Sequence, residues 1–370
     1  MSMCYKMFSR GISAIKETLP LVVILTLFFA SFGYSQGATM GIVVVNEAKK
    51  IQEALDRLGR EGGGILFLPA GTYVIEKTLK IPSNVILRGA GAGTILKPTI
   101  AIGERQYPDN RVISNADVEG GNKGIIIEDL VVDGELLGEY HKTGIYGISL
   151  NNCDNCIIRS VIVRRCSGEG ILVSYGKGNT IVENCIAEEN NCGINIHHIQ
   201  GAVLLRNNIC KRNGVHKPKY GGIGIFVEAV ENVSIVGNVC QDNAWAGIVW
   251  MGGADEARGI KYPSKDCLIA NNICIGNGSQ GGIFINGTYS DTKRFLVNAN
   301  LCKENKGNGI WGFKVKEGII SNNLSLNNNG WGISLVESEG IMVANNLALE
   351  NDKGGIEANR EKNIVVNNLE

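Results

Sequence analysis

The residues best suited to proton transfer and anion binding lie close together in the middle of the chain. Asn195 and His197 stand two residues apart, and Glu228 takes the place of His197 in the next sequence repeat. Proton abstraction beside a carboxylate needs a base, an acid, and an amide or cation that holds the carboxylate. His197 or Lys217 could act as the base, and Tyr220 as the acid. Asn195 or Arg258 could hold the carboxylate.

A short repeat must position these side chains. A Gly-Ile pair recurs along the chain, and its undisturbed spacing is 23 residues, as between Gly309, Gly332 and Gly355. A fixed short period is typical of a solenoid. A coil of this length holds three short strands, each pairing in parallel with its counterpart in the next coil. The aligned pairs begin at Gly147, Gly170, Gly193, Gly224, Gly247, Gly282, Gly309, Gly332 and Gly355. The repeat predicts an all-β, single-stranded parallel β-helix whose aligned coils cover about 124–370.

The Gly-Ile strand is expected to form the floor of a groove. Because side chains alternate along a strand, the Ile points inward and its neighbours point outward. The expected floor residues, coil by coil, are Ser149 and Asn151, Leu172 and Ser174, Asn195 and His197, Phe226 and Glu228, Val249 and Met251, Phe284 and Asn286, and Trp311 and Phe313. His197, Lys217, Tyr220 and Glu228 are therefore the candidate catalytic residues. The candidate binding residues are Asn195, Phe226, Arg258, Phe284, Asn286 and Trp311.

Four insertions interrupt the repeat and are expected to wall this groove. They span 134–143, 213–220, 251–265 and 287–293, and all flank the Gly-Ile strand. Insertions in a solenoid usually gather on its working face. They would bring His216, Lys217, Lys219 and Tyr220 from one side and Arg258, Lys261, Tyr262 and Arg294 from the other.

Recurring Asn and Cys residues are interpreted as structural. Asn is suited to a left-handed corner and can hydrogen-bond to the copy above and below it. The expected ladder is Asn184, Asn208, Asn238, Asn272, Asn300, Asn323, Asn346 and Asn368, with Asp129 at the same position of an earlier coil. Cys210, Cys240, Cys274 and Cys302 fall two residues after a ladder Asn, where a small apolar group is expected to be buried. We interpret the Cys153-x-x-Cys156 pair as packing rather than a metal or redox site, although both alternatives stay open.

Overall composition excludes one class of partner. The chain has 36 basic and 36 acidic residues among 370. It therefore has no basic field to attract nucleic acid, and no nucleic-acid partner is expected.

The ends of the chain suggest an exported single domain. Residues 1–35 pair basic positions with an apolar run and predict a cleaved signal peptide, an uncleaved anchor being the alternative. The remaining 36–370 would form one domain without a membrane partner, beginning with a cap helix at about 47–60. The last coil stops at Glu370 without a cap, which leaves an open end that could support a homo-oligomer.

The first coils carry a family resemblance. A helix, a Gly-rich turn at Gly62–Gly64, the run FLPAGTY at Phe67–Tyr73 and LRGAG at Leu87–Gly91 follow one another. This order resembles the N-terminal cap of pectate-lyase-like right-handed parallel β-helix proteins, in particular the rhamnogalacturonase/epimerase-like pectate lyase domain. The resemblance implies a right-handed helix and a protein that acts on polysaccharide. The signal peptide at 1–35 predicts that the protein is secreted, periplasmic or on the cell surface.

The residues and the resemblance together favour β-elimination on an acidic polysaccharide. A C5-epimerase shares the first step, while a glycoside hydrolase needs a second carboxyl group beside Glu228. The Asp-Pro-His motif of alginate epimerases, the Arg-x-Pro-x-Arg pattern of many pectate lyases and the paired Asp and Gly-His-Gly of polygalacturonases are missing, so a non-catalytic carbohydrate-binding or surface-structural solenoid stays an alternative. No cofactor is certain, although Glu228, Asp255 and Glu256 form a weak calcium candidate.

Overall fold

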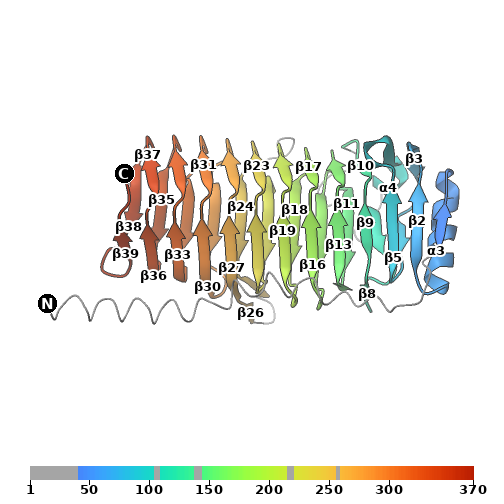
Figure 1. Ribbon diagram of the computed structural model, residues 1–370, viewed down its shortest axis with the longest axis horizontal. Helices are drawn as coiled ribbons and strands as arrows, with labels where there is room; N and C mark the ends of the chain where they lie inside the picture. Colours follow the sequence, from blue (N-terminus) through green and yellow to red (C-terminus); the bar gives the residue numbers. More distant parts are fainter. Residues whose placement is uncertain (1–40, 104–108, 137–143, 215–220, 256–258) are drawn as a thin grey trace. The chain divides into compact units, whose positions relative to one another are not determined.

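The chain forms a single-stranded right-handed parallel β-helix, as the repeat and the resemblance predict (Figure 1). The computed structural model describes residues 41–103, 109–136, 144–214, 221–255 and 259–370. Three long parallel sheets run through the coils, and most coils give one strand to each. The predicted signal peptide at 1–35 lies outside the described residues, and the domain boundaries stay predictions.

Sheet A has 13 strands and sheets B and C have 11 each. Sheet A contains β1 (Ile42–Val44), β2 (Gly64–Leu68), β5 (Val85–Gly89), β9 (Ile126–Glu128), β13 (Cys156–Arg159), β16 (Thr180–Glu183), β19 (Val203–Arg206), β22 (Val233–Val236), β27 (Ser264–Ala270), β30 (Thr292–Asn298), β33 (Lys316–Ser321), β36 (Glu339–Ala344) and β39 (Ile364–Val366). Sheet B contains β3 (Gly71–Ile75), β6 (Thr94–Pro98), β10 (Val131–Asp133), β14 (Ile162–Arg164), β17 (Ile186–Glu188), β20 (Ile209–Lys211), β23 (Val239–Gln241), β28 (Ile273–Ile275), β31 (Leu301–Lys303), β34 (Leu324–Leu326) and β37 (Leu347–Leu349).

Sheet C is formed by the Gly-Ile strands and their two predecessors. It contains β4 (Leu79–Ile81), β7 (Arg111–Asn115), β11 (Tyr146–Asn151), β15 (Glu169–Ser174), β18 (Cys192–His197), β21 (Ile223–Glu228), β24 (Ala246–Met251), β29 (Gly281–Asn286), β32 (Ile310–Phe313), β35 (Trp331–Val336) and β38 (Gly354–Ala358). Two small pairs complete the strands, parallel β8 (Asn122–Lys123) with β12 (Cys153–Asp154) and antiparallel β25 (Gly253–Asp255) with β26 (Ile260–Tyr262).

An amphipathic helix covers the first coil (Figure 1). The 3₁₀ turn η1 (Ala48–Lys50) leads into α3 (Ile51–Arg60), which packs against β2 and β4. Its buried side chains are Ile51, Ala54, Leu55 and Leu58. Two short helical segments follow, η2 (Gly91–Gly93) and α4 (Ile100–Gly103). In the described part of the chain, no helix is long and apolar enough to cross a membrane.

The Gly of each Gly-Ile pair is required by close packing rather than by a left-handed backbone. A Cβ on Gly247 would lie 2.5 Å from the carbonyl oxygen of Gly282 and 3.0 Å from Nδ2 of Asn277. Any side chain there would collide with the next coil, so this position of sheet C requires Gly.

Stacked amides hold the corner between sheets A and B. Nδ2 of Asn272 donates to Oδ1 of Asn300 at 3.0 Å and to the carbonyl of Ile235 at 2.9 Å, while its Oδ1 accepts from Asn238. The ladder runs through seven coils, at Asn208, Asn238, Asn272, Asn300, Asn323, Asn346 and Asn368. The amide stacking expected from the sequence is therefore confirmed.

The assignment of Asn184 to this ladder is wrong by one residue. The backbone N–H of Cys185 donates to Oδ1 of Asn208, so Cys185 holds the ladder position in its coil. Asn184 has a left-handed φ of 53°, like Asn207 at 55°. The left-handed backbone thus belongs to the residue before each ladder Asn, and Asp129, with φ of 56°, has the same place.

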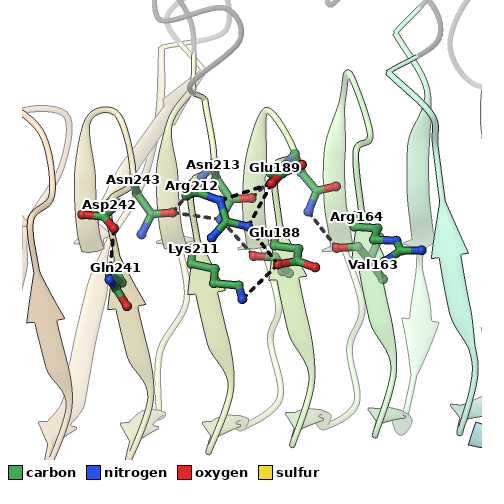
Figure 2. Close-up of polar contacts among 12 residues, drawn as sticks. Val163, Arg164, Glu188, Glu189, Lys211, Arg212, Asn213, Gln241, Asp242 and Asn243 are labelled. Atoms are coloured by element: carbon green, nitrogen blue, oxygen red, sulfur yellow. Dashed lines mark hydrogen bonds and ion pairs between the residues drawn. The ribbon is translucent and has the colours of Figure 1, made fainter. Parts of the chain in front are cut away.

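A second amide ladder turns the chain from sheet B into sheet C. It comprises Asn190, Asn213, Asn243, Asn277, Asn305, Asn328 and Asn351. Figure 2 shows this corner, where Asn213 donates to Oδ1 of Asn243 at 2.8 Å. On the outer surface beside it, Lys211 and Arg212 form ion pairs with Glu188 at 3.1 and 3.3 Å.

Removing one ladder amide should cost measurable stability. Asn272 is 1 % exposed, so Asn272→Ala leaves the buried donors and acceptors of its neighbours without partners. We expect the free energy of unfolding to fall by about 2 kcal/mol. Urea unfolding followed by circular dichroism measures this against Asn329→Ala, an Asn-to-Ala change at an exposed position. Equal midpoints for the two variants would contradict a stabilising role of the ladder.

The ten Cys residues in the described part are buried free thiols. Cys210, Cys240, Cys274 and Cys302 pair in register along sheet B, followed by Ser325. Burial raises the pKa of the Cys156 thiol to about 11 and that of Cys153 further still. Cys153 and Cys156 are accordingly packed and hard to ionise. The burial expected of Cys210, Cys240, Cys274 and Cys302 is confirmed, and their lack of reactivity stays a prediction.

Buried carboxylates of the early coils are tied to arginines. Asp133 is fully buried and accepts from Nε of Arg164 at 2.9 Å and of Arg165 at 2.7 Å. Burial alone would raise the pKa of Asp133, but the bonds from Arg165 and the charges of both arginines hold it below its usual value. The carboxylate is a structural part of the corner.

Candidate functional site

The predicted polar cluster lies at the carboxyl edge of sheet C. Ser174, His197, Glu228 and Met251 are in register on four successive strands. Neighbouring strands are about 4.8 Å apart, so His197 and Glu228 lie next to each other on one face. The alignment of the Gly-Ile pairs at Gly193 and Gly224 predicts this adjacency, and the register confirms it.

Two histidines and two tyrosines form a compact group at this edge. Nδ1 of His197 lies 3.1 Å from Nδ1 of His198. The ring of Tyr175 stacks on His198 with centroids 4.9 Å apart, and the Tyr262 ring meets His198 edge-on at 4.6 Å. Tyr262 comes from β26, so the wall insertion reaches the floor at this point. We call these residues and Glu228 the histidine cluster.

Burial favours the neutral form of both histidines. Burial, together with a smaller effect of the neighbouring His198, lowers the pKa of His197 to about 4. Burial also lowers the pKa of His198. Since two neutral imidazoles share one Nδ1–H, His197 can donate it to His198 and leave its Nε2 free to accept a proton.

The carboxyl group of Glu228 is largely buried without a charged partner among the described residues, unlike that of Asp133. Burial raises its pKa, and no hydrogen bond or ion pair joins it to any residue that the structure describes. A Cβ on Gly253 would lie 2.9 Å from its Oε1, so the wall chain passes directly beside it. A carboxyl group of this kind retains its proton to higher pH than an ordinary one and can serve as a proton donor.

Unpartnered polar atoms line the same outer face beyond the cluster. Oγ of Ser149, Oδ1 of Asn195 and Nε1 of Trp311 are buried and have no hydrogen-bond partner within the described ranges. Buried polar groups are normally satisfied, and an unsatisfied group costs stability. Their strands span six steps of sheet C, a length of about 29 Å.

Aromatic side chains occupy the middle of this face. Phe284 and Trp311 stack with ring centroids 4.4 Å apart, and Trp245 meets Phe284 edge-on at 6.4 Å. Phe226 and Phe313 pack at the margins of the same cluster.

The expectation of an open floor needs correction. Ser149, Leu172, Ser174, Val249, Met251 and Phe284 point outward as predicted but are all buried. Phe284 is 4 % exposed because Trp245 and Trp311 pack on it, so it supports its neighbours rather than offering a free ring. The partly exposed candidates are Asn195, Phe226, Asn286 and Trp311. Their contact with a ligand stays a prediction.

Several predicted wall residues lie outside the described residues. These are Lys217, Tyr220, His216, Lys219, Glu256 and Arg258, together with the side chain of Asp255. Arg294 does not join the groove, since it donates to both carboxylate oxygens of Asp266, each at 2.7 Å. Within the described ranges no group of three His, Cys, Asp or Glu is arranged to hold a metal ion. The calcium candidate, which needs Asp255 and Glu256, stays a prediction.

Two residues of the site were missed from sequence. Tyr175 and Trp245 do not lie at outward positions of the Gly-Ile strand, so the alternation rule does not reach them. The register offers a signal for Tyr175. The backbone N–H of Tyr175 pairs with His197 as that of His198 pairs with Glu228, so the two residues hold equivalent corner positions.

Comparison with known proteins agrees with this fold. The family model described as rhamnogalacturonase A/epimerase, pectate lyase-like matches residues 37–248. The chain belongs to this pectate-lyase-like family. A second model, the periplasmic copper-binding protein NosD, matches residues 254–369.

Relatives of the chain in sequence include enzymes and phage proteins. Mannuronan C5-epimerase AlgE2 of Azotobacter vinelandii is 27 % identical over 255 residues, covering 65 % of this chain and 24 % of that protein. The pre-neck appendage protein of Bacillus phage phi29 is 24 % identical over 281 residues, covering 57 % and 32 %. The chain thus spans about a quarter to a third of these relatives.

Solved structures share the fold at low identity. The A-module of Azotobacter vinelandii mannuronan C-5 epimerase AlgE4 superposes with a TM-score of 0.65 at 18 % identity, covering 88 % of this chain and 97 % of that one. The tailspike of E. coli bacteriophage HK620, solved with a pentasaccharide, also gives 0.65 at 15 % identity, covering 88 % and 62 %.

Proposed function

We propose that the outer face of sheet C binds an acidic polysaccharide and that the histidine cluster removes the C5 proton of a uronate unit. The observation that carries this proposal is the pairing of a neutral His197 with a Glu228 carboxyl of raised pKa on adjacent strands. β-Elimination is the favoured outcome, and C5-epimerisation is the alternative that begins with the same step. Relatives named mannuronan C5-epimerases support the substrate class. We also propose that the protein is exported, as residues 1–35 predict, because acidic polysaccharides of this kind lie outside the cell.

The chemistry assigns a role to each residue. Nε2 of His197 takes the C5 proton while its Nδ1–H stays bonded to His198. In elimination, the electrons of the C5–H bond form the C4–C5 double bond as the bond from C4 to the glycosidic oxygen breaks. That oxygen takes the proton of the Glu228 carboxyl. In epimerisation, a proton instead returns to the opposite face of C5. The Asn195 amide holds the uronate carboxylate.

A low pKa makes His197 a weak base until substrate binds. The uronate carboxylate brings a negative charge beside the imidazole, which favours the protonated form and raises its pKa. The base therefore strengthens only when substrate is present, which suits abstraction of a weakly acidic proton.

Hydrolysis is disfavoured by the spacing of carboxyl groups. A glycoside hydrolase needs two such groups about 5–9.5 Å apart. On the described strands of sheet C, the other carboxyl groups are Glu169, two strands and several residues from Glu228, and Glu357 near the C-terminal end. Neither is close enough to act with Glu228. Hydrolysis would need a second carboxyl group from the wall, at Asp255, Glu256 or Asp291, and it stays the alternative on that condition. A non-catalytic binding solenoid would use the same unpartnered groups without turnover.

One panel experiment separates these outcomes. The protein is incubated in D₂O with polymannuronate, polygalacturonate and neutral dextran, each with calcium and with a chelator. We expect unsaturated uronate ends by absorbance on an acidic polymer, or deuterium at C5 by NMR without chain cleavage. New reducing ends without a double bond would contradict proton abstraction. Binding without any reaction would favour the binding solenoid, and binding of dextran alone would overturn the acidic substrate class. Loss of reaction with the chelator would support the calcium candidate.

A further inference from the structure

The β25–β26 hairpin is an insertion between β24 and β27 that belongs to none of the three long sheets. Its first antiparallel pair joins Gly253 to Tyr262. Gly253 is buried and Tyr262 is partly buried, whereas Ile260 and Lys261 of the same hairpin are exposed. The first pair is therefore the part of the described hairpin that packs against the solenoid.

Gly253, the first member of this pair, packs directly on the candidate acid. A Cβ on Gly253 would lie 2.9 Å from Oε1 of Glu228 and 3.2 Å from Cβ of Ala229. No side chain fits there unless the carboxyl group moves. Because directly opposed residues of an antiparallel pair point to the same face, the Tyr262 side chain projects toward the same region.

Tyr262, the second member, packs on the partner of the candidate base. Its ring meets the imidazole of His198 edge-on at 4.6 Å, and the ring of Tyr175 stacks on the same imidazole at 4.9 Å with an interplanar angle of 23°. The backbone of His198 is left-handed, with φ of 57°, and its N–H donates to the carbonyl of Glu228. The backbone is thus fixed by the coil, while the direction of the ring is fixed by the two tyrosines.

The direction of the His198 ring decides which nitrogen of His197 is basic. The two Nδ1 atoms lie 3.1 Å apart, so His198 can accept the Nδ1–H of His197. A neutral imidazole carries its proton on one nitrogen, and the hydrogen bond made by that nitrogen selects the tautomer. Only the tautomer with the proton on Nδ1 leaves Nε2 of His197 free to take a proton.

We propose that Tyr262 and Gly253 are positioning residues for proton transfer. Tyr262 holds the His198 ring so that Nε2 of His197 stays free, and Gly253 closes over the Glu228 carboxyl group. The inference rests on the proposed function. It makes an inserted hairpin, rather than the repeat alone, responsible for arranging both the base and the acid.

NMR of ¹⁵N-labelled histidine tests the role of Tyr262 without substrate, with His197→Ala and His198→Ala assigning the signals. In the wild type and in Tyr262→Phe, which keeps the ring, His197 should carry its proton on Nδ1. In Tyr262→Ala, His197 should populate both tautomers. Lys261→Gln is the control, because Lys261 alternates with Tyr262 on β26 and faces the other side. Identical spectra for Tyr262→Ala and Lys261→Gln would overturn the role of Tyr262.

The pH dependence of the same variants separates positioning from a merely structural role. The titratable side chains that the described chain places around His198 are Tyr175, His197, Glu228 and Tyr262. Burial lowers the pKa of His197, so water admitted by Tyr262→Ala should raise that pKa and move the acid limb of kcat/KM to higher pH. On polymannuronate or polygalacturonate, kcat should fall about tenfold in Tyr262→Ala and stay near the wild-type value in Tyr262→Phe. A lower kcat with an unmoved acid limb would contradict positioning.

Gly253→Ala tests the second contact. The added methyl group should displace the Glu228 carboxyl and slow elimination about tenfold, while the NMR signals of the two imidazoles stay as in the wild type. Gly41→Ala is the matched control, because a Cβ at Gly41 would meet nothing within 4 Å. Equal elimination rates for the two Gly→Ala variants would overturn the role of Gly253.

The inference and the proposed function fail in different ways. If the wild-type protein removes C5 protons while Tyr262→Ala keeps the wild-type tautomer and rate, the positioning role is wrong and the proposed function stands. If no acidic polymer reacts, the proposed function falls, and the catalytic meaning of the hairpin falls with it even where the NMR spectra of Tyr262→Ala change.

Discussion

Replacing His197 with alanine is expected to lower the rate of proton abstraction by about 10²–10⁴-fold, the usual contribution of a positioned general base. The loss should appear in kcat, while binding of an acidic oligosaccharide should change little because Asn195 and the aromatic cluster remain. Rates are measured as unsaturated ends or as C5 deuterium exchange. Glu339→Gln, an exposed change on sheet A, is the control.

The pH profile separates a chemical role of His197 from a merely structural one. Burial lowers the pKa of His197 to about 4 in the free protein, so kcat/KM should fall below about pH 4 as the imidazole becomes protonated. In elimination it should also fall on the alkaline side as the Glu228 carboxyl, whose pKa burial raises, loses its proton. Bound substrate raises this pKa, so the acid limb of kcat should lie at higher pH. A single limb near 6.5 in both parameters would show that an ordinary histidine acts instead. Undiminished turnover by His197→Ala would remove the base from the proposal altogether.

Much of the fold follows from the sequence because one period governs every coil. The Gly-Ile pairs predicted which strands form sheet C, and alternation along them placed His197 and Glu228 side by side. The sequence is a weaker guide to which residue at each corner stacks its amide in the ladder. Asn often occurs as a pair, as in Asn271-Asn272, where the first residue takes the left-handed backbone and the second stacks its amide. In the Asn184 coil only the first of the pair is present, and composition alone cannot reveal the shift.

The candidate site was less predictable because its closure depends on side chains outside the repeat. Trp245 covers Phe284, and Tyr175 supports His198 from a corner. Neither follows from strand alternation, which gives the direction of a side chain but not what packs over it. The burial that shifts the pKa values of His197 and Glu228 therefore became apparent only from the packed structure.

Replacing Trp250 in the core is also expected to have a large effect, on the stability of the fold. Its side chain is fully buried in β24, in register with Val227 and Ile285, and its ring meets Phe295 of sheet A edge-on at 6.1 Å. Most inward positions of sheet C carry Val, Ile or Leu, so Trp250 fills space that no neighbour can reach. Trp250→Ala should lower the free energy of unfolding by about 3–5 kcal/mol through the cavity it leaves.

A second substitution distinguishes lost volume from lost polarity at this position. Nε1 of Trp250 is buried without a hydrogen-bond partner in the described part of the chain. Trp250→Phe retains most of the ring and removes this unsatisfied N–H, so it should cost less than about 1.5 kcal/mol. Urea unfolding of both variants provides the measurement.

Trp250→Ala should also weaken binding of an acidic hexasaccharide under conditions in which the protein stays folded. The reason is that β24 carries Met251 on the outer face and leads to Gly253, which lies beside Glu228. Equal stability of the two variants would mean that the coil collapses around the missing ring, and that the outer face does not depend on this part of the core.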